Sequence, residues 1–323
     1  MNCFLYLEGL KELSIRLRGD EKIHLGIRPY QFHAGNILSI GAYPYLLCEE
    51  VKKLGKTPRF TFIISLNDWE QDELVGEDIY RYIFDVRPKH TTIQHLKADN
   101  GENMTDHWET KIKHELKLII QDFPEVKIGY VRNSELRYHP LMQEALIHTL
   151  NNRHKHKEIL LKYSKKPTNG TDTRFANAVC DKCYNIDTES EVLPKKLIRL
   201  TCTECGKNAI GSILSFNYWF YHKELFSARL AILRFDVSIS GSDHYAEGDY
   251  ATRKALYELI YEKPFPNLKM LFAPILLSDD GQKMSKSRDN YKYIPLGTIL
   301  SYARTNINSS LSLNNASIEA LLR

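Results

Sequence analysis

The sequence lacks the features of a membrane or secreted protein. No stretch approaches the ~20 consecutive apolar residues that a membrane-spanning helix needs. Residues 1–8 contain neither a basic segment nor a long apolar core of the kind found in signal peptides. Internal repeats, heptad patterns and low-complexity tracts are also missing. We therefore expect a cytoplasmic, globular protein with no membrane partner.

An excess of charge of one sign is missing too, and cysteine is scarce. The 44 Lys and Arg residues against 40 Asp and Glu leave a formal net charge of +4, which permits a polyanionic partner without demonstrating one. Four of the six cysteines form two close pairs, which favours metal binding in a reducing compartment over disulfides. A chain of 323 residues is long enough for a main domain with an insertion or a short appendage.

Alternating strand and helix patterns predict a parallel sheet. After a helix at 5–17, a strand at 23–27, a helix at 37–54 closed by Gly55 and a buried strand at 60–66 form a βαβ unit. The alternation continues with helices expected at 106–121, 218–233 and 248–261, and strands at 126–131, 236–241 and 268–274. The predicted fold class is α/β, with a Rossmann-like, doubly wound parallel sheet.

We expect four segments along the chain. Residues 1–139 form the first half of the sheet domain, and 140–215 form an insertion that contains a basic helix at 140–166 and the cysteine pairs. Residues 216–277 complete the sheet domain. Residues 278–323 carry a loop rich in lysine and serine and a short helical segment.

The first candidate ligand-binding motif lies where the strand at 23–27 turns into a helix. It contains Gly26, Pro29, His33, Gly35 and Asn36. The carboxyl end of a strand is where a doubly wound sheet binds its ligands, and backbone N–H groups at a helix start can approach a phosphate. A capping or surface histidine is the alternative interpretation of His33.

The second motif is the run Lys283, Met284, Ser285, Lys286 and Ser287, which follows an Asp-Asp-Gly turn. Two ammonium groups and two hydroxyls within five residues suit a loop that closes over a triphosphate. Lysines placed there neutralise the charge that builds up on a leaving pyrophosphate. A solvated basic loop is the alternative.

The third motif is Gly241, Ser242, Asp243 and His244, at the end of the strand expected at 236–241. An acidic side chain at this place can hold a ribose hydroxyl. A plain helix cap is the alternative role for Asp243.

The fourth motif is two cysteine pairs. Cys180 and Cys183 are separated by two residues, eighteen residues follow, and Cys202 and Cys205 repeat the close spacing. This is the spacing of a zinc ribbon, in which four thiolates hold a structural Zn²⁺ that contributes folding energy. A redox pair or chance clustering is the alternative.

In this order the motifs resemble the signatures of class I aminoacyl-tRNA synthetases, and most of all the archaeal-type class I lysyl-tRNA synthetase, over residues 22–290. The resemblance implies activation of an amino acid as its adenylate, with ATP and Mg²⁺ as substrate and pyrophosphate as product. It assigns His33 and Asn36 to the phosphates, and Lys283 and Lys286 to the transition state. ATP-binding positions by the same resemblance are Pro29, Gly35, Gly241, Asp243, His244, Met284, Ser285 and Ser287.

The amino-acid pocket is expected beside these motifs. Its predicted residues are Gly26, Arg28, Asn67 and Asp68, with Trp69 next to them. Lysine is the first expectation for the substrate, although the stretch from Asn67 to Trp69 is less acidic than the resemblance implies. The basic helix near 153–166 either meets a tRNA acceptor stem or is a solvated charged face.

The resemblance fails at the C-terminus. Only 33 residues follow Asn290, whereas a full lysyl-tRNA synthetase continues into an anticodon-binding region. We therefore expect an enzyme that charges tRNA through its acceptor stem, or a paralogue that transfers the aminoacyl group to a carrier protein or small amine. Two other classes stay open, namely an inactive ligand-binding regulatory module and a nucleotidylyltransferase of the same superfamily.

Overall fold

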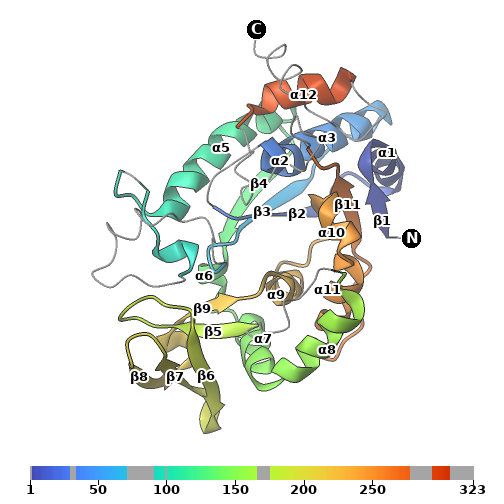
Figure 1. Ribbon diagram of the computed structural model, residues 1–323. Coiled ribbons are helices and arrows are strands. Elements are labelled where there is room, and N and C mark those ends of the chain that lie inside the picture. The colour runs from blue at the N-terminus through green and yellow to red at the C-terminus, as the bar shows by residue number, and fades with distance from the viewer. Residues whose placement is uncertain are drawn as a thin grey trace.

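The computed structural model describes residues 2–29, 34–70, 91–98, 100–165, 175–276 and 293–305. Its centre is a six-stranded parallel sheet in the order β1-β11-β10-β2-β3-β4 (Figure 1). The strands are β1 (Cys3–Leu5), β2 (Lys22–Ile27), β3 (Thr61–Leu66), β4 (Lys127–Arg132), β10 (Val237–Gly241) and β11 (Lys269–Ala273).

The sheet is wound in two directions from its centre. From β2 the chain adds β3 and β4 on one side, whereas β10 pairs with the other side of β2 and is followed by β11. The central pair of strands is β10 and β2, in which register pairs Val237 with Ile23, Ser238 with His24 and Ile239 with Leu25. The predicted doubly wound parallel sheet is confirmed.

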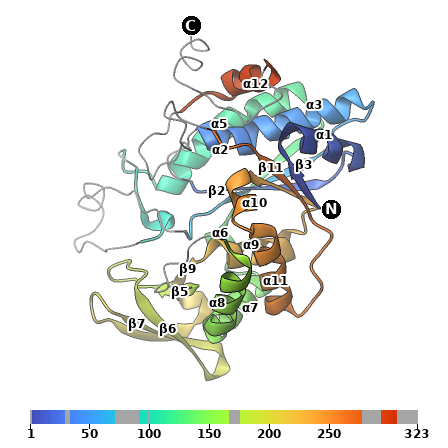
Figure 2. The same ribbon diagram turned by 45° about the vertical axis from the view of Figure 1, so that its right-hand side comes forward.

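Helices cover both faces of the sheet, and each face has its own hydrophobic core. Figures 1 and 2 show α3 and α5 on one side of the sheet, and α7, α9 and α11 on the other. The longer helices are α1 (Tyr6–Arg16), α3 (Tyr43–Lys53), α5 (Met104–Asp122), α7 (Pro140–Asn151), α8 (Arg153–Tyr163), α9 (His222–Leu233), α11 (Asp249–Tyr261) and α12 (Leu296–Thr305). Within the described ranges, no helix combines the length and the apolar character that a membrane crossing requires.

The helix that follows the first motif is not regular. We predicted one helix at 37–54, but the chain forms α2 (Ala34–Ile37), a π-helical turn (Leu38–Ala42) and then α3. Gly41 lies in this turn against α12, where a methyl group on its Cα would lie 2.9 Å from Leu296 Cδ1. π-helical turns often occur at functional sites, and this one directly follows the first motif.

The insertion between β4 and β10 begins with α6 (Asn133–Leu136), α7 and α8 and continues with two small antiparallel sheets. One pairs β5 (Ala176–Val179) with β9 (Asn217–Phe220), and the other contains β6 (Thr188–Leu193), β7 (Leu197–Cys202) and β8 (Asn208–Ser212).

Two further local predictions were wrong, and one short strand was missed. The helix predicted at 218–233 begins only at His222, because Tyr218 and Phe220 alternate with more exposed neighbours and are buried as strand residues. The basic helix predicted at 140–166 is two helices that meet at Asn152. The strand β1 was missed because three residues are too few to show a period.

Candidate functional site

The candidate site lies where the sheet reverses its winding, between β2 and β10. At such a point the loops after the two strands separate, and the crevice between them is where open α/β sheets bind ligands. A cavity of about 340 Å³ opens here. Its lining brings together six of the predicted site residues, namely Gly26, Arg28, Asn36, Asn67, Asp243 and His244.

The floor of the cavity is polar although it belongs to the sheet. His24 on β2 and Ser238 on β10 are partners in register, with His24 Nδ1 3.1 Å from Ser238 Oγ. The His24 ring stacks on Phe235 with centroids 4.4 Å apart. Burial lowers the pKa of His24 well below its ordinary value, so the imidazole is neutral. Among the described residues, its buried Nε2 has no hydrogen-bond partner.

Gly26 leaves this floor open. A methyl group on its Cα would lie 3.5 Å from His24 Cε1 and 3.7 Å from Asn67 Nδ2. Any larger side chain would therefore cover both polar groups. This gives the glycine a physical role at the end of β2 that does not depend on an unusual backbone conformation.

A buried arginine forms one wall, and sequence analysis missed it. Arg229 on α9 is 3% exposed and donates a hydrogen bond from Nη1 to Asn67 Oδ1. Burial lowers the pKa of Arg229 to about 10, while the charge of Glu70 opposes that change. All residues from Lys223 to Leu230 on α9 are buried, so the charged residues among them lie inside the protein. Charged residues within this otherwise apolar segment were the sequence signal that could have indicated Arg229.

Glu70 was also missed. Its side chain is buried, and its Oε2 accepts a hydrogen bond of 2.7 Å from Arg28 Nε. Its second oxygen, Oε1, is buried without a hydrogen-bond partner in the described part of the chain. A buried carboxylate oxygen is costly unless it is paired, so the cavity is suited to a ligand that donates to it.

Two predicted neighbours of Glu70 face elsewhere. The Asp68 carboxylate accepts hydrogen bonds from the backbone N of Ser134 at 3.0 Å and from Ser134 Oγ, and it does not line the cavity. Burial raises the pKa of Asp68 to about 6, and the bonds to Ser134 limit the rise. Trp69 is fully buried, with its ring 5.9 Å from that of Tyr218. These two residues attach the end of β3 to the insertion.

The first motif is only partly visible. Asn36 lines the cavity from α2, whereas Pro29 and Gly35 are placed but do not line it. Ser39 Oγ donates hydrogen bonds of 3.1 Å to the carbonyl oxygens of Gly35 and Asn36. His33 lies outside the described residues.

The second motif lies outside the described residues altogether. Its predicted site residues are Lys283, Met284, Ser285, Lys286 and Ser287. Their roles stay predictions from the sequence.

The third motif delivers an acidic side chain to the cavity. A methyl group on Gly241 Cα would lie 2.4 Å from Asp243 Oδ1, so the carboxylate occupies the space that a side chain at 241 would need. Asp243 and His244 both line the cavity from α10 (Ser242–Ala246). The glycine therefore determines where the Asp243 carboxylate can lie.

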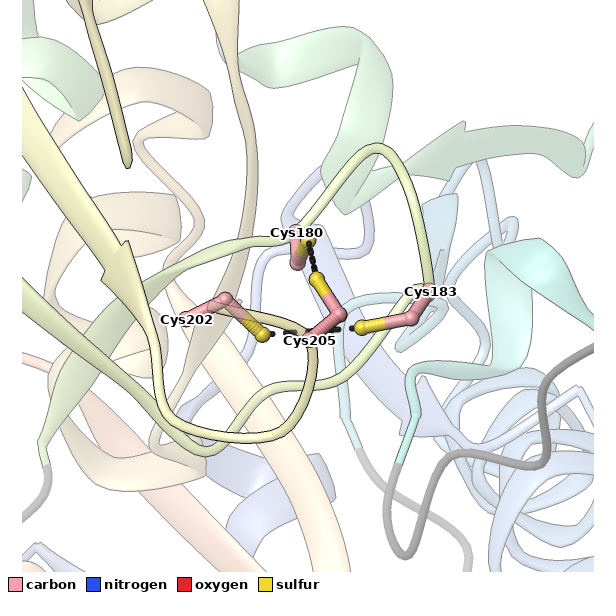
Figure 3. Close-up of side chains that lie close together, drawn as sticks. All are labelled: Cys180, Cys183, Cys202 and Cys205. Carbon is pink, nitrogen blue, oxygen red and sulfur yellow. Dashed lines mark hydrogen bonds between the residues drawn. The ribbon is translucent and has the colours of Figure 1, made fainter. Parts of the chain in front are cut away.

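The four cysteines form a second site, in the insertion. Their sulfur atoms all lie within 4.8 Å of one another, with Sγ atoms 3.6 Å apart for Cys180 and Cys205 and 3.5 Å apart for Cys183 and Cys202 (Figure 3). Sulfurs at ~2.3 Å from a tetrahedral Zn²⁺ would be about 3.8 Å apart. The four thiols therefore fit a structural zinc ion and leave no coordination position open.

The turns that carry these cysteines are shaped for metal binding. The backbone N of Tyr184 donates to Cys180 O at 2.8 Å, and that of Gly206 donates to Cys202 O at 3.1 Å. Tyr184 and Gly206 both have positive φ, at 57° and 68°. Each cysteine pair thus lies on a tight turn that brings its two thiols to one side.

A second cluster of possible metal ligands among the described residues lies at the edge of the cavity between β2 and β10. Nitrogen or oxygen atoms of His244, Glu247 and Asp249 lie within 4.8 Å of one another. The Asp249 carboxylate, however, already contacts Lys223 Nζ at 3.0 Å and Arg253 Nη2 at 2.9 Å. Two cations at this distance disfavour a divalent cation, so we do not assign a metal here.

Comparison with known families decides which class of protein has this cavity. Residues 78–318 match the family model described as tRNA synthetases class I (K). The chain belongs to this family. The matched region of this class I synthetase contains the third motif, the cysteine pairs and the second motif, and it begins after the first motif. The prediction of a class I synthetase core is confirmed.

Solved synthetase structures match this chain at low sequence identity and low structural similarity. Tyrosyl-tRNA synthetase from Leishmania major, in complex with tyrosinol, is 12% identical over 88% of this chain and 31% of its own, with a TM-score of 0.40. Tryptophanyl-tRNA synthetase from Mycoplasma pneumoniae is 11% identical over 84% of this chain and 60% of its own, with a TM-score of 0.39.

The glutamate tRNA ligase from Elizabethkingia meningosepticum is 13% identical over 84% of this chain and 52% of its own, with a TM-score of 0.35. The chain thus spans between about a third and three fifths of these proteins. No curated protein matches the sequence.

Proposed function

We propose that this protein activates an amino acid with ATP and transfers the aminoacyl group to an acceptor. The observation that carries the proposal is the polar cavity between β2 and β10, where Asn36 from one motif meets Asp243 and His244 from another. Membership of the class I synthetase family supports ATP with Mg²⁺ as the co-substrate. In this reaction a carboxylate oxygen bonds to the α-phosphorus of ATP, and the bond from that phosphorus to pyrophosphate breaks.

The residues of the cavity suit the binding of both substrates. Asp243 accepts hydrogen bonds from the ribose hydroxyls, and Asn36 lies at the start of α2, where backbone donors face a phosphate. Lys283 and Lys286 neutralise the charge that develops on the pyrophosphate. Catalysis then consists of positioning and of electrostatic stabilisation, as phosphoryl transfer chemistry generally requires.

We propose lysine as the amino acid. The description of the matching family carries the letter K, the one-letter code of lysine. The buried Glu70 Oε1 supports this choice, because the ε-ammonium of lysine would give it the donor that it lacks in the described part of the chain.

An acidic amino acid is the competing substrate, and Arg229 is the observation that favours it. This buried guanidinium lines the cavity, and its Nε has no hydrogen-bond partner among the described residues. A side-chain carboxylate could pair with it. The choice between the two substrates therefore depends on whether Glu70 or Arg229 meets the substrate side chain.

The deciding experiment is ATP–pyrophosphate exchange with each of the twenty amino acids. We expect exchange with lysine, and we expect Glu70→Gln to raise the KM for lysine at least about tenfold while leaving the KM for ATP within about twofold, since one charge-assisted hydrogen bond is lost. Exchange with glutamate that Arg229→Met abolishes would instead establish the competing substrate. An enzyme that exchanges with no amino acid would refute the proposed activity.

Two further variants test the role of the second motif in the same assay. Lys283→Ala and Lys286→Ala should each lower kcat about 100-fold or more while the protein stays folded, because each removes a charge that acts mainly in the transition state. Near-normal exchange in both variants would mean that this loop takes no part in the chemistry.

The acceptor needs its own assay. We propose tRNA, which the family name supports. Purified protein, ATP and radiolabelled amino acid are incubated with bulk tRNA, with small amines and with carrier proteins in parallel. Radioactivity that is precipitated with tRNA and released by mild base supports the proposal, whereas label found only in an amide product identifies a non-tRNA acceptor.

A further inference from the structure

Asp249, the first residue of α11, is a fully buried carboxylate with three charged or polar neighbours. Lys223 Nζ lies 3.0 Å from Oδ1, while Arg253 Nη2 and His244 Nδ1 each lie 2.9 Å from Oδ2. Burial alone would raise the pKa of Asp249, but the Arg253 charge and the His244 hydrogen bond outweigh burial and hold it well below its usual range. The contacts with Lys223, Arg253 and His244 therefore keep the carboxylate ionised at neutral pH.

The ionised carboxylate determines the protonation of the His244 ring. An ionised carboxylate can only accept hydrogen bonds, so the proton between it and His244 is on Nδ1. In the neutral imidazole Nε2 then carries a lone pair and acts as an acceptor. The His244 side chain is 34% exposed and lines the cavity, so this acceptor is presented to a ligand.

The partners of Asp249 keep it in place. Lys223 belongs to α9 and also donates to Ser164 Oγ at 3.0 Å, and Arg253 is one turn further along α11. Both cations are almost completely buried. The carboxylate is thus held from two helices, and a charged group held in this way can fix the orientation of the histidine ring bonded to it.

We propose that Asp249 is a positioning residue for the nucleotide site, which holds His244 as the Nδ1–H tautomer so that Nε2 accepts a hydrogen bond from a ribose hydroxyl of ATP. The inference rests on the proposed function in one respect, namely that the ligand is an adenine nucleotide. Asp249 itself does not line the cavity and acts through His244.

A double-mutant cycle measured by calorimetric titration with ATP tests this role. We expect Asp249→Asn and His244→Gln each to raise the Kd about five- to tenfold, the loss of one hydrogen bond. In the His244→Gln background, Asp249→Asn should change the Kd less than about twofold, because the group through which it acts is gone. If Asp249→Asn raised the Kd for ATP by the same factor in both backgrounds, the inference would be refuted and Asp249 would serve only the stability of the fold.

A matched control separates the loss of a buried charge from the loss of positioning. Glu224 follows Lys223 directly on α9, is equally buried and bonds through Oε1 to His156 Nδ1 at 3.1 Å; neither residue lines the cavity. Glu224→Gln should leave the Kd for ATP within about twofold, as expected for a change that removes no contact to the ligand.

A spectroscopic measurement keeps the inference testable if Asp249→Asn does not fold. In the nitrogen-15 NMR spectrum of the wild-type protein, neutral His244 should show protonated Nδ1 and unprotonated Nε2. The opposite tautomer would overturn the inference. Wild-type protein that shows the expected tautomer but binds no ATP would refute the proposed nucleotide site, while leaving the contact between Asp249 and His244 established.

Discussion

Gly248 connects the cavity between β2 and β10 to the helix α8, and replacing it should destabilise the protein. The residue precedes α11 with φ of +75°, and a methyl group on its Cα would lie 2.3 Å from the carbonyl oxygen of Tyr163. The adjacent backbone is joined as well, since Lys165 N donates to Glu247 O at 3.0 Å. Gly248→Ala therefore meets both backbone strain and a steric overlap that only movement of the main chain can relieve.

The two costs can be separated because the chain contains a matched glycine. Gly55 also has a φ of +75°, but a methyl group there would meet no atom within 4 Å. Gly55→Ala should lower the free energy of unfolding by the left-handed backbone cost alone, about 1–2 kcal/mol. Gly248→Ala adds the overlap, which at about 1–3 kcal/mol brings the total to roughly 2–5 kcal/mol.

Urea unfolding followed by tryptophan fluorescence measures both variants against the wild type. ATP binding should also weaken in Gly248→Ala and not in Gly55→Ala, because Glu247 beside Gly248 lines the cavity. Equal destabilisation of the two variants would show that the close approach of α8 to residue 248 does not constrain the protein.

Three further predictions follow from contacts described above. Removing zinc with a chelator should destabilise the insertion by up to about 10 kcal/mol, measured as a fall in melting temperature that added Zn²⁺ reverses; a metal-free protein with unchanged melting would contradict the assignment. Burial raises the pKa of Asp68 to about 6 in the folded protein, against about 4 in the unfolded chain. The stabilisation that this carboxyl group gives the folded state is therefore fully present below pH 4 and is lost as the pH rises through 6. Between pH 4 and pH 7 the free energy of unfolding should therefore fall by about 2–3 kcal/mol more in the wild type than in Asp68→Asn, measured by urea titration at the two pH values. Parallel pH profiles of the two proteins would refute this. Gly241→Ala should displace the Asp243 carboxylate and raise the KM for ATP about tenfold without changing the KM for the amino acid, in steady-state exchange kinetics; an unchanged KM for ATP would remove Asp243 from the nucleotide site.

The parts of the fold that sequence predicted are those with local patterns. The strand at β2 alternates over a few residues, and the spacing of Cys180, Cys183, Cys202 and Cys205 is typical of a zinc site. The strand β9 was assigned to a helix because Tyr218 and Phe220 run directly into the apolar pattern of α9. Only the pairing with β5, which the local pattern does not contain, fixes those residues as a strand.

The parts of the site that sequence did not predict depend on distant partners. Glu70 and Arg229 look like ordinary surface charges until α9 is placed over the end of β3, where both become buried. Asp68 was grouped with the site because it follows a strand, yet its partner is Ser134, 66 residues further along the chain. Polar residues of this kind are recognisable only when the tertiary contacts that bury them are known.

The contact between His24 and Ser238 joins residues 214 positions apart, with the whole insertion between them. During synthesis at about 5–20 residues per second, the edge of β2 waits about 10–40 s for its neighbour to emerge. Until then β2 exposes an unpaired strand edge, which in a nascent chain invites wrong pairing. We therefore expect the cavity between β2 and β10 to form late, and the yield of folded protein to depend on how well this edge is protected while the ribosome completes β10.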